Sequence, residues 1–397
     1  MSKMVLSGKG RRWLQKGHPW VYSDDVADGM GQPGELLPVE DPNGEPLGWA
    51  LFSASSRIAL RMVTRDAEQP TRDFWLGRVA RAIQVRAKHG LLDPEGACRL
   101  IAGDSDGLPG FIADRYRDVI VLQCSTQSAD RMRDFLIELI EEAMPFPIST
   151  VVDRSDVAVR RFEGLETRVE TVKGDEPDPI IVHEPGGLKF EVNVLSGHKT
   201  GAYLDQRDNR IRTAELVNGR KVLDAFAYDG LFGIRAAMAG AEEVVCLEQN
   251  AAACERIRAN AERNGVSDKV KIERVNCMQD LRNRADANER YGVVVLDPPA
   301  FARNKKELEG AERGYVELNR RAASLLEPGG DLISASCSYA AKTESFVRWI
   351  GIGTRLAGRE SWLESLHGAA PDHPYRIELP ESQYLKCAFV RLDGDGA

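Results

Sequence analysis

The pattern of apolar and polar positions divides the chain into three parts. Over the first 65 or so residues, short apolar stretches such as Leu47–Phe52 and Ile58–Val63 lie between turn signals such as Asp41-Pro42-Asn43-Gly44, which is typical of β-strands. From Thr71 to about Lys88, apolar residues recur at helical spacing instead. The pattern therefore predicts a small β-rich domain over residues 1–70.

A second, α+β part follows. Two strands are predicted at Phe111–Asp114 and Val119–Gln123, and a helix is predicted at Asp130–Ala143. An acidic linker that contains proline, Gly174–Pro179, ends this part of the chain. We therefore predict a middle domain over residues 71–179.

From Ile180 onward the chain alternates regularly between apolar strands and helices. This alternation indicates an α/β fold in which helices cover both faces of a parallel sheet. The last two predicted strands, Tyr375–Leu379 and Leu385–Leu392, have only a short loop between them and should form an antiparallel hairpin. The other predicted strands of this third domain, residues 180–397, are Val222–Phe226, Val244–Glu248, Val270–Val275, Val293–Asp297 and Leu332–Ala335, and its helices are Leu231–Ala239, Ala251–Asn264, Arg313–Leu326 and Thr343–Leu356.

Composition and charge narrow the class of protein. The 397 residues are 43% hydrophobic and carry a net charge of −8, so a nucleic acid would have to be bound by local basic patches. The seven cysteines form no Cys-x-x-Cys pair and no metal-binding spacing, which predicts reduced thiols, a cytoplasmic location and no metal site. The sequence shows neither a signal peptide nor an apolar run approaching the roughly 18 residues of a membrane span.

Polar residues follow the predicted strands at the edge where an α/β sheet binds its ligands. The first turn, from Asp224 to Gly233, lacks the Gly-x-Gly-x-x-Gly fingerprint, which disfavours a dinucleotide. Asp224, at the end of the first strand, suits a cationic amine. The Glu248 carboxylate suits the two hydroxyls of a ribose, and Asn276 suits the amino group of adenine. An adenosine joined to an amino acid is S-adenosylmethionine, which we predict as the cofactor.

Two further strand ends carry the candidate chemistry. Asp297-Pro298-Pro299 can hold the hydrogen-bonding edge of a flat ring, and Cys337, between Ser336 and Ser338, can act as a nucleophile in the same pocket. Carbon 5 of a pyrimidine is a poor nucleophile until a thiolate adds to carbon 6, and a base must later remove the carbon 5 proton. A single cysteine on a strand is more often a small buried residue, but its pairing with Asp-Pro-Pro favours methylation of carbon 5.

Five motifs extend this reading over nearly the whole chain, namely Lys16–Tyr22, Gly107–Gly110, Gly197–Arg207, Val295–Phe301 and Ser336–Ser338. Together they resemble the RlmI-type family of PUA-domain methyltransferases, which make 5-methylcytosine in large-subunit ribosomal RNA. The resemblance implies an RNA-binding PUA domain, a middle domain, and a class I Rossmann-like methyltransferase domain whose mostly parallel seven-stranded sheet ends in an antiparallel hairpin. It also implies that Cys337 adds covalently to carbon 6 of a cytosine in 23S rRNA.

The resemblance also implies a set of site residues. Cys337 and Asp297 would be catalytic, and Arg207 would meet the methionine carboxylate. Two positions depart from the family pattern, because relatives carry aspartate at Asn276 and often threonine at Asp229. The expected cofactor-binding residues are Asp205, Gln206, Arg207, Asp224, Phe226, Tyr228, Gly230, Glu248, Gln249, Asn276, Cys277 and Asp297, and the expected substrate-binding residues are Pro298, Pro299, Phe301, Lys305, Lys306 and Ser338.

A base in a duplex cannot reach a buried cysteine, so the expected substrate is a loop or unfolded region of ribosomal RNA. Solvated basic clusters that could contact it are Lys9, Arg11, Arg12 and Lys16 near the start, and Arg303, Lys305 and Lys306 after the Asp-Pro-Pro turn. A homodimer stays open. So do two other functions: methylation of an exocyclic amine with Cys337 as a bystander, and non-catalytic RNA binding in ribosome assembly. A dehydrogenase is a distant third alternative.

Overall fold

Four β-sheets lie in the part of the chain that the computed structural model describes, which is residues 2–177, 179–302 and 305–393, without the side chain of Lys305. The sheets belong to two units. The first unit comprises Met1–Val182, Val192–Leu204 and Pro371–Ser382, and the second comprises His183–Glu191, Asp205–Ala370 and Gln383–Ala397. The predicted domain boundaries near residues 70 and 179 stay a prediction.

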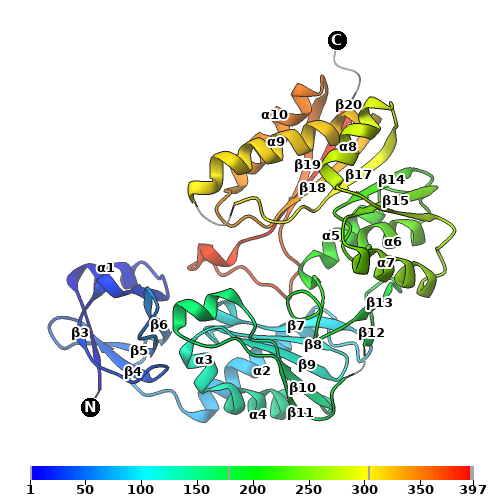
Figure 1. The fold of residues 1–397 in the computed structure, drawn as a ribbon. Helices are drawn as coiled ribbons and strands as arrows, with labels where there is room; N and C mark the ends of the chain where they lie inside the picture. Colours follow the sequence, from blue (N-terminus) through cyan, green and yellow to red (C-terminus); the bar gives the residue numbers. More distant parts are fainter. Residues whose placement is uncertain (1, 178, 303–304, 394–397) are drawn as a thin grey trace. The chain divides into compact units, whose positions relative to one another are not determined.

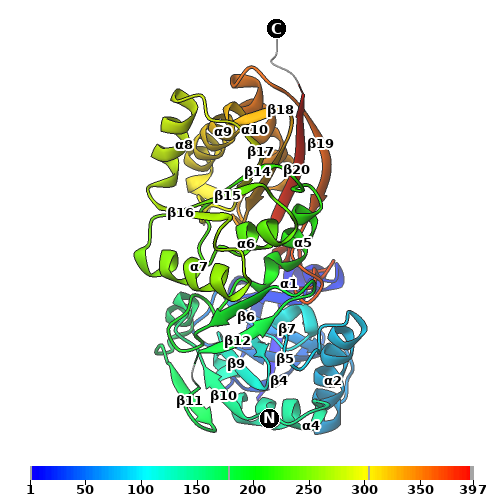
Figure 2. The ribbon, with the colours of Figure 1, turned by 90° about the vertical axis from the view of Figure 1, so that its right-hand side faces the viewer.

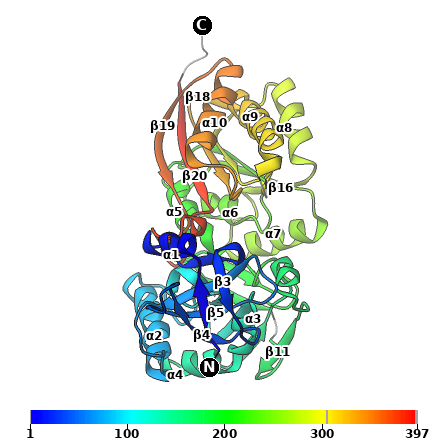
Figure 3. The same ribbon diagram turned by 90° about the vertical axis from the view of Figure 1, so that its left-hand side faces the viewer.

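A six-stranded sheet with the order β2-β6-β5-β4-β1-β3 begins the first unit (Figure 3). Helix α1 (Gly8–Gln15) begins where the Ser7 hydroxyl accepts a hydrogen bond from Gly10 N at 3.1 Å, which is a standard N-cap. Fully buried Leu6, Val39 and Leu60 form the core of this sheet. Its strands are β1 (Met4–Leu6), β2 (Trp20–Tyr22), β3 (Val26–Gly29), β4 (Leu36–Glu40), β5 (Pro46–Phe52) and β6 (Ile58–Thr64).

A second sheet of the same unit has the order β11-β10-β9-β8-β7. Helices α2 (Arg72–Lys88) and α4 (Arg133–Ala143) bury Val79 and Leu139 in the same apolar core as Phe111 and Ile120 of this sheet. Helix α3 (Gln127–Arg131) directly precedes α4, so the single predicted helix is two helices. The strands are β7 (Ala97–Ala102), β8 (Phe111–Tyr116), β9 (Val119–Cys124), β10 (Thr150–Asp153) and β11 (Glu170–Lys173).

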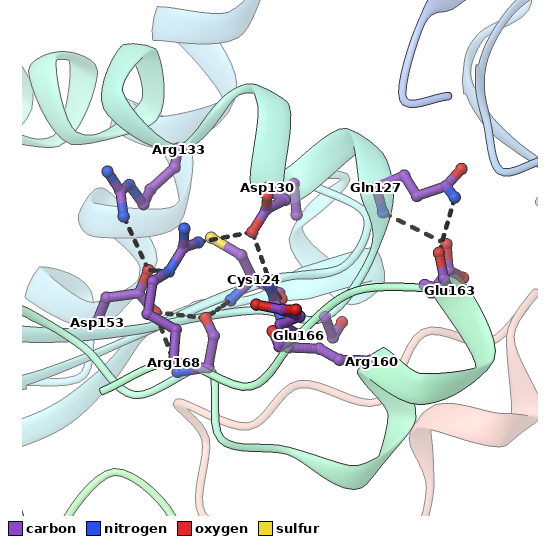
Figure 4. Close-up of polar contacts among 12 residues, drawn as sticks. Cys124, Gln127, Asp130, Arg133, Asp153, Arg160, Glu163, Glu166 and Arg168 are labelled. Atoms are coloured by element: carbon purple, nitrogen blue, oxygen red, sulfur yellow. Dashed lines mark hydrogen bonds and ion pairs between the residues drawn. The ribbon is translucent and has the colours of Figure 1, made fainter. Parts of the chain in front are cut away.

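Charged side chains tie this second sheet to its surrounding loops and helices (Figure 4). Fully buried Asp153, at the end of β10, accepts from Arg133 Nη1 at 3.2 Å and from Arg168 Nε at 2.9 Å. Asp130 accepts from Arg168 Nη2 at 2.6 Å and from Arg160 Nη1 at 2.8 Å. Because each carboxylate binds two guanidinium groups, the network satisfies its buried charges internally.

The segment Pro371–Ser382 belongs to the first unit, although a strand was predicted at Tyr375–Leu379. That prediction is wrong: these residues form no strand, and Ile377 is exposed. The segment is held by Asp372 instead, whose carboxylate accepts from Arg99 N at 2.9 Å and whose carbonyl accepts from Arg86 Nη2 at 2.8 Å. The alternation of apolar and polar residues here reflects an exposed loop.

The second unit is built on a seven-stranded sheet with the order β16-β15-β14-β17-β18-β20-β19 (Figure 1). The first five strands in this order are parallel, and β20 is antiparallel to both of its neighbours. The predicted parallel sheet with an antiparallel closing hairpin is therefore confirmed, but its first hairpin strand is β19 rather than residues 375–379. The strands are β14 (Lys221–Ala225), β15 (Glu243–Glu248), β16 (Val270–Arg274), β17 (Tyr291–Leu296), β18 (Leu326–Ser336), β19 (Glu360–His367) and β20 (Lys386–Asp393).

Helices cover both faces of this sheet (Figure 2). On one face, Leu281, Leu318 and Phe346 of α8, α9 and α10 share a core with Leu223 and Val294 of the sheet. Helices α5, α6 and α7 cover the other face. The helices are α5 (Arg207–Ala214), α6 (Leu231–Met238), α7 (Ala251–Arg263), α8 (Cys277–Asp286), α9 (Leu308–Ser324) and α10 (Thr343–Leu356), and a separate two-stranded sheet pairs β12 (Ile180–His183) with β13 (Lys189–Val192).

Candidate functional site

The five parallel strands of the second unit end at the same edge of the sheet. In the observed register, Asp224 of β14 is the partner of Cys246 of β15 and of Val295 of β17. The edge therefore brings together the ends of β14, β15 and β16 on one side and of β17 and β18 on the other. The first group carries the predicted cofactor residues from Asp224 to Cys277, and the second carries Asp297 and Cys337, whereas Asp205, Gln206 and Arg207 lie before β14 at the start of α5.

The turn after β14 is folded unusually tightly. Phe226, Tyr228 and Gly230 have φ angles of 65°, 53° and 73°, so two non-glycine residues adopt the left-handed conformation. Only glycine fits at position 230, because a Cβ there would lie 2.7 Å from Cγ2 of Ile257. Such strained turns are concentrated at ligand-binding sites.

Asp224 anchors this turn to the sheet. Its Oδ2 accepts from Gly233 N, in the first turn of α6, at 2.9 Å, and its side chain is buried. The pKa of Asp224 is raised to about 7, chiefly by burial and also by the nearby carboxylates of Asp297 and Glu248, while the Gly233 hydrogen bond acts in the opposite direction. The Asp224 carboxyl therefore has a structural role at the turn, and a cationic ligand beside it would favour its ionised form.

Glu248, at the end of β15, is held by three backbone N–H groups. Its Oε1 accepts from Gln249 N and Asn250 N, both at 2.8 Å, and its Oε2 accepts from Tyr228 N at 2.9 Å. An ionised carboxylate has about four acceptor sites, so the remaining capacity lies on Oε2. The carboxylate is thus oriented rigidly, with one oxygen able to accept from a ribose hydroxyl.

Asp229, one of the two departures from the family pattern, is paired with α7. Its Oδ1 accepts from Arg256 Nε at 2.6 Å, and the guanidinium carbon of Arg256 lies 5.0 Å from the centre of the Tyr228 ring. The Asp229 side chain is buried. Its negative charge is therefore balanced by a guanidinium group of α7.

Asn276, the other departure, begins helix α8. Its Oδ1 accepts from Gln279 N at 3.1 Å, so the atom predicted to meet adenine also caps the helix. Cys277 is buried, and burial raises its pKa to about 12, so its thiol stays protonated and unreactive.

The residues from Asp205 to Arg210 form a buried polar cluster beside Asp224. Glu184 accepts from Arg210 and Arg235; burial opposes its ionisation, but Arg210, Arg235 and Arg207 lower its pKa below the ordinary value. Arg210 also lowers the pKa of Asp224. Arg207, Arg210 and Arg235 are buried here, with Arg207 also 3.4 Å from Asp208, and guanidinium groups of this kind can bind a ligand carboxylate.

Gln206 gives a second test of whether a ligand fits this cluster. It is 2% exposed, its Oε1 accepts from Asn209 Nδ2 at 2.7 Å, and its Nε2 has no hydrogen-bond partner among the described residues. A buried donor without a partner is costly and indicates a missing acceptor. The cluster therefore fits the carboxylate of S-adenosylmethionine, while Asp205 Oδ2 is already bound by the Tyr384 hydroxyl at 2.7 Å.

Ser338 joins the two loops on the catalytic side. Its buried Oγ accepts from Phe301 N at 3.1 Å and from Ala302 N at 3.3 Å, in the loop that carries Asp297. The Tyr315 hydroxyl on α9 contacts the same Oγ at 3.1 Å and donates to Ser336 Oγ at 2.8 Å. These contacts position the two loops relative to each other, and the predicted contact of Ser338 with substrate stays a prediction.

The remaining predicted substrate residues differ in exposure. Pro298 is buried, Pro299 and Lys306 are exposed, and Phe301 lies half-buried with its ring 4.7 Å from that of Tyr315. The side chain of Lys305, and Arg303 as a whole, lie outside the described residues. Tyr315 was not predicted as a site residue, because a tyrosine within an amphipathic helix carries no signal of its own.

The basic cluster near the start is only partly available. Lys9, Arg12 and Lys16 are exposed, but Lys9 forms an ion pair with Asp25 at 2.8 Å and Arg11 forms one with Asp41 at 3.1 Å. Within the described ranges, no group of three or more metal-ligating side chains is found, and no helix has the length and apolar character needed to cross a membrane.

Comparison with known proteins agrees with this geometry. The model of the S-adenosylmethionine-dependent methyltransferase family matches residues 150–350, and that of the PUA-like domain matches residues 4–65. A solved structure assigned to the methyltransferases, in complex with SAH, superposes with a TM-score of 0.85 at 19% identity and covers 98% of this chain and 100% of that one.

Curated relatives are similar over their whole length. The ribosomal RNA large subunit methyltransferase I of Erwinia tasmaniensis is 39% identical over 99% of this chain and 100% of its own. The protein of the same name from Photobacterium profundum is 36% identical over 97% of this chain and 98% of its own. The strand-end site, the two family matches and these relatives together show that the chain belongs to the PUA-domain family of S-adenosylmethionine-dependent methyltransferases that includes the ribosomal RNA large subunit methyltransferases I.

Proposed function

We propose that this methyltransferase acts on carbon 5 of a cytosine in large-subunit ribosomal RNA through a covalent bond between Cys337 Sγ and carbon 6. The observation that carries the proposal is the placement of Cys337. Of the seven cysteines, all of which the structure describes, six are buried and only Cys337 is partly exposed. It follows the end of β18, next to the strand that ends before Asp297.

The neighbouring side chains support this role. Ser336 and Ser338, bridged by Tyr315, fix the backbone on both sides of Cys337. Bound S-adenosylmethionine supplies an electrophilic methyl group. The Cys337 thiolate adds to carbon 6 and makes carbon 5 nucleophilic, while Asp297 holds the hydrogen-bonding edge of the ring, and the thiol leaves once the carbon 5 proton has been removed.

We further propose that the residues assigned to the cofactor divide its binding. Arg207 and Gln206 would hold the methionine carboxylate, Asp224 the amino group, Glu248 a ribose hydroxyl, and Asn276 the adenine. The PUA-like domain would contact RNA outside the target base, with exposed Arg12 and Lys16 approaching phosphates.

The experiment that tests the proposal uses ribosomal RNA substituted with 5-fluorocytosine. Fluorine at carbon 5 cannot leave as a proton does, so the covalent intermediate should persist as an adduct that resists denaturant. We expect the adduct with the wild-type protein and S-adenosylmethionine, and none with Cys337→Ser. Methyl transfer to ordinary RNA without any adduct would support methylation of an exocyclic amine instead.

A further inference from the structure

Lys386 is the first residue of β20 and contacts the turn that carries Cys337. In the antiparallel register of β18 and β20, Lys386 is the partner of Ser336. Its Nζ donates to the carbonyl oxygens of Ser338 at 2.8 Å and of Ala341 at 2.9 Å. These two carbonyls follow Cys337 in the chain, so the ammonium group is fixed by the same backbone that positions the thiol.

Among the described residues, the contacts of the Lys386 ammonium group are to backbone oxygens rather than to an acid. The side chain is 4% exposed, and its Nζ donates to the two carbonyl oxygens. Burying an ammonium group without a counter-charge is costly, and two carbonyl acceptors offset only part of this cost. A function is therefore needed to explain why a lysine occupies this position.

Two opposing effects act on the pKa of Lys386. Burial lowers it to about 8, and the negative charge that Cys337 acquires on ionisation acts in the opposite direction. The interaction is reciprocal, so the ammonium group favours the thiolate form of Cys337.

The other titratable groups around Cys337 either disfavour its thiolate form or are neutral. Asp297, after β17, carries a charge of the same sign as a thiolate and disfavours it. Tyr315, on α9, is neutral, because burial raises its pKa to about 12 and Cys337 and Asp297 add to the effect. Burial likewise raises the pKa of Cys387, the neighbour of Lys386, well above its ordinary value. Arg212 is a second cation near this strand and lowers the pKa of Cys387, but Lys386 is the cation bound to the backbone that follows Cys337.

We propose that Lys386 is a positioning residue that keeps Cys337 as a thiolate before RNA binds. The S–H bond breaks, its proton goes to solvent, and its electron pair stays on Sγ beside the ammonium group, where it can form the bond to carbon 6. The inference rests on the proposed function for the use of that thiolate. The state of the thiol itself can be measured without RNA.

The test is the pH dependence of Cys337 alkylation by iodoacetamide in the full-length protein, followed by mass spectrometry of the peptide that contains Cys337. The six buried cysteines react slowly, which makes the probe selective. We expect a wild-type midpoint below the ordinary thiol value of about 8.5. In Lys386→Met the midpoint should rise by about one pH unit, so that the alkylation rate at pH 7 falls about tenfold. Lys386→Arg, which keeps the charge, should restore a low midpoint.

The matched control is Lys342→Met. Lys342 is exposed and lies one residue beyond Ala341, so loss of a lysine there should leave the midpoint unchanged. Equal midpoints in wild type and Lys386→Met would show that Lys386 only supports the fold. If Lys386→Met does not fold, the wild-type curve decides, because a midpoint at or above the ordinary value overturns the inference and a lower one supports it.

This result is separable from that of the 5-fluorocytosine experiment. An adduct with coincident midpoints would refute the role of Lys386 alone. A shifted midpoint without any adduct would refute the carbon 5 chemistry while leaving the activated thiol in place.

Discussion

Replacing Tyr315 by phenylalanine removes a single oxygen atom from the centre of the catalytic side. The residue is fully buried on α9, and its hydroxyl donates to Ser336 Oγ at 2.8 Å and contacts Ser338 Oγ at 3.1 Å. The ring stays in place because it packs against Phe346 and Trp349. The substitution therefore tests the hydrogen bonds on both sides of Cys337 without creating a cavity.

The expected magnitude follows from those two bonds. A buried hydrogen bond contributes about 0.5–1.5 kcal/mol net, so losing both should cost about 1–3 kcal/mol in the free energy of unfolding. The Cys337 turn would also become less rigid relative to the loop that carries Asp297. If about 1.4 kcal/mol of this cost appears in the activation free energy because the reacting groups are less well aligned, the rate of methyl transfer falls about tenfold.

The assay compares single-turnover transfer of labelled methyl groups, thermal unfolding and calorimetric binding of S-adenosylmethionine. We expect a slower transfer with unchanged cofactor affinity, because Tyr315 contacts the β17–β18 side of the site. Tyr291→Phe is the control: its hydroxyl is also buried, accepts from Arg284 Nη1 at 2.9 Å and donates to Glu289 at 2.7 Å, but it lies at the other end of β17. Tyr315→Phe with lower stability and an unchanged rate would refute a positioning role.

Three further predictions concern other parts of the molecule. Glu248→Gln places an amide against three backbone N–H groups and should weaken S-adenosylmethionine binding about 10–100-fold by calorimetry, whereas Glu243→Gln, at the start of β15, should not. The folded-state pKa of Asp224 is raised to about 7, so its contribution to stability is present below about pH 4 and is lost as the pH rises towards 7. Chemical unfolding should therefore show that Asp224→Asn gains stability relative to wild type across that interval. Asp153→Asn should cost about 3–5 kcal/mol of stability by breaking its pairs with arginine, while the exposed Asp134→Asn should stay within about 0.5 kcal/mol.

The strand ends of the second unit could be predicted because each buried strand is a continuous apolar run that stops at a polar residue. Val293–Leu296 and Asp297 illustrate this, and the same holds for β14 and β15. In a parallel sheet, side chains that follow such runs must meet at one edge. The identity of the cofactor followed from chemistry at that edge.

The hairpin strand could not be predicted in the same way. β19 is an edge strand with a register shift between Leu363 and Ser365, so its side chains do not alternate cleanly between buried and exposed. Residues 375–379 alternate well but lie in a loop fixed by the bonds of Asp372 to Arg86 and Arg99. Those bonds join positions more than 250 residues apart in the sequence, and periodicity cannot reveal them.

Side-chain direction limited the prediction of the site itself. Ser338 was predicted to contact substrate and Asp229 was noted as a departure from the family pattern, and both are polar residues beside strand ends that are buried against a partner on a helix. For Asp229 the partner is Arg256, which lies beyond the first turn of α7. An acid can therefore replace the more usual residue in this turn without adding charge to the cofactor pocket, because a guanidinium on the adjacent helix balances it. Lys386 differs from Asp229, because it is a buried charge that contacts two backbone carbonyl oxygens instead of an ion of opposite sign, and its pKa is lowered by burial and raised by the charge of Cys337.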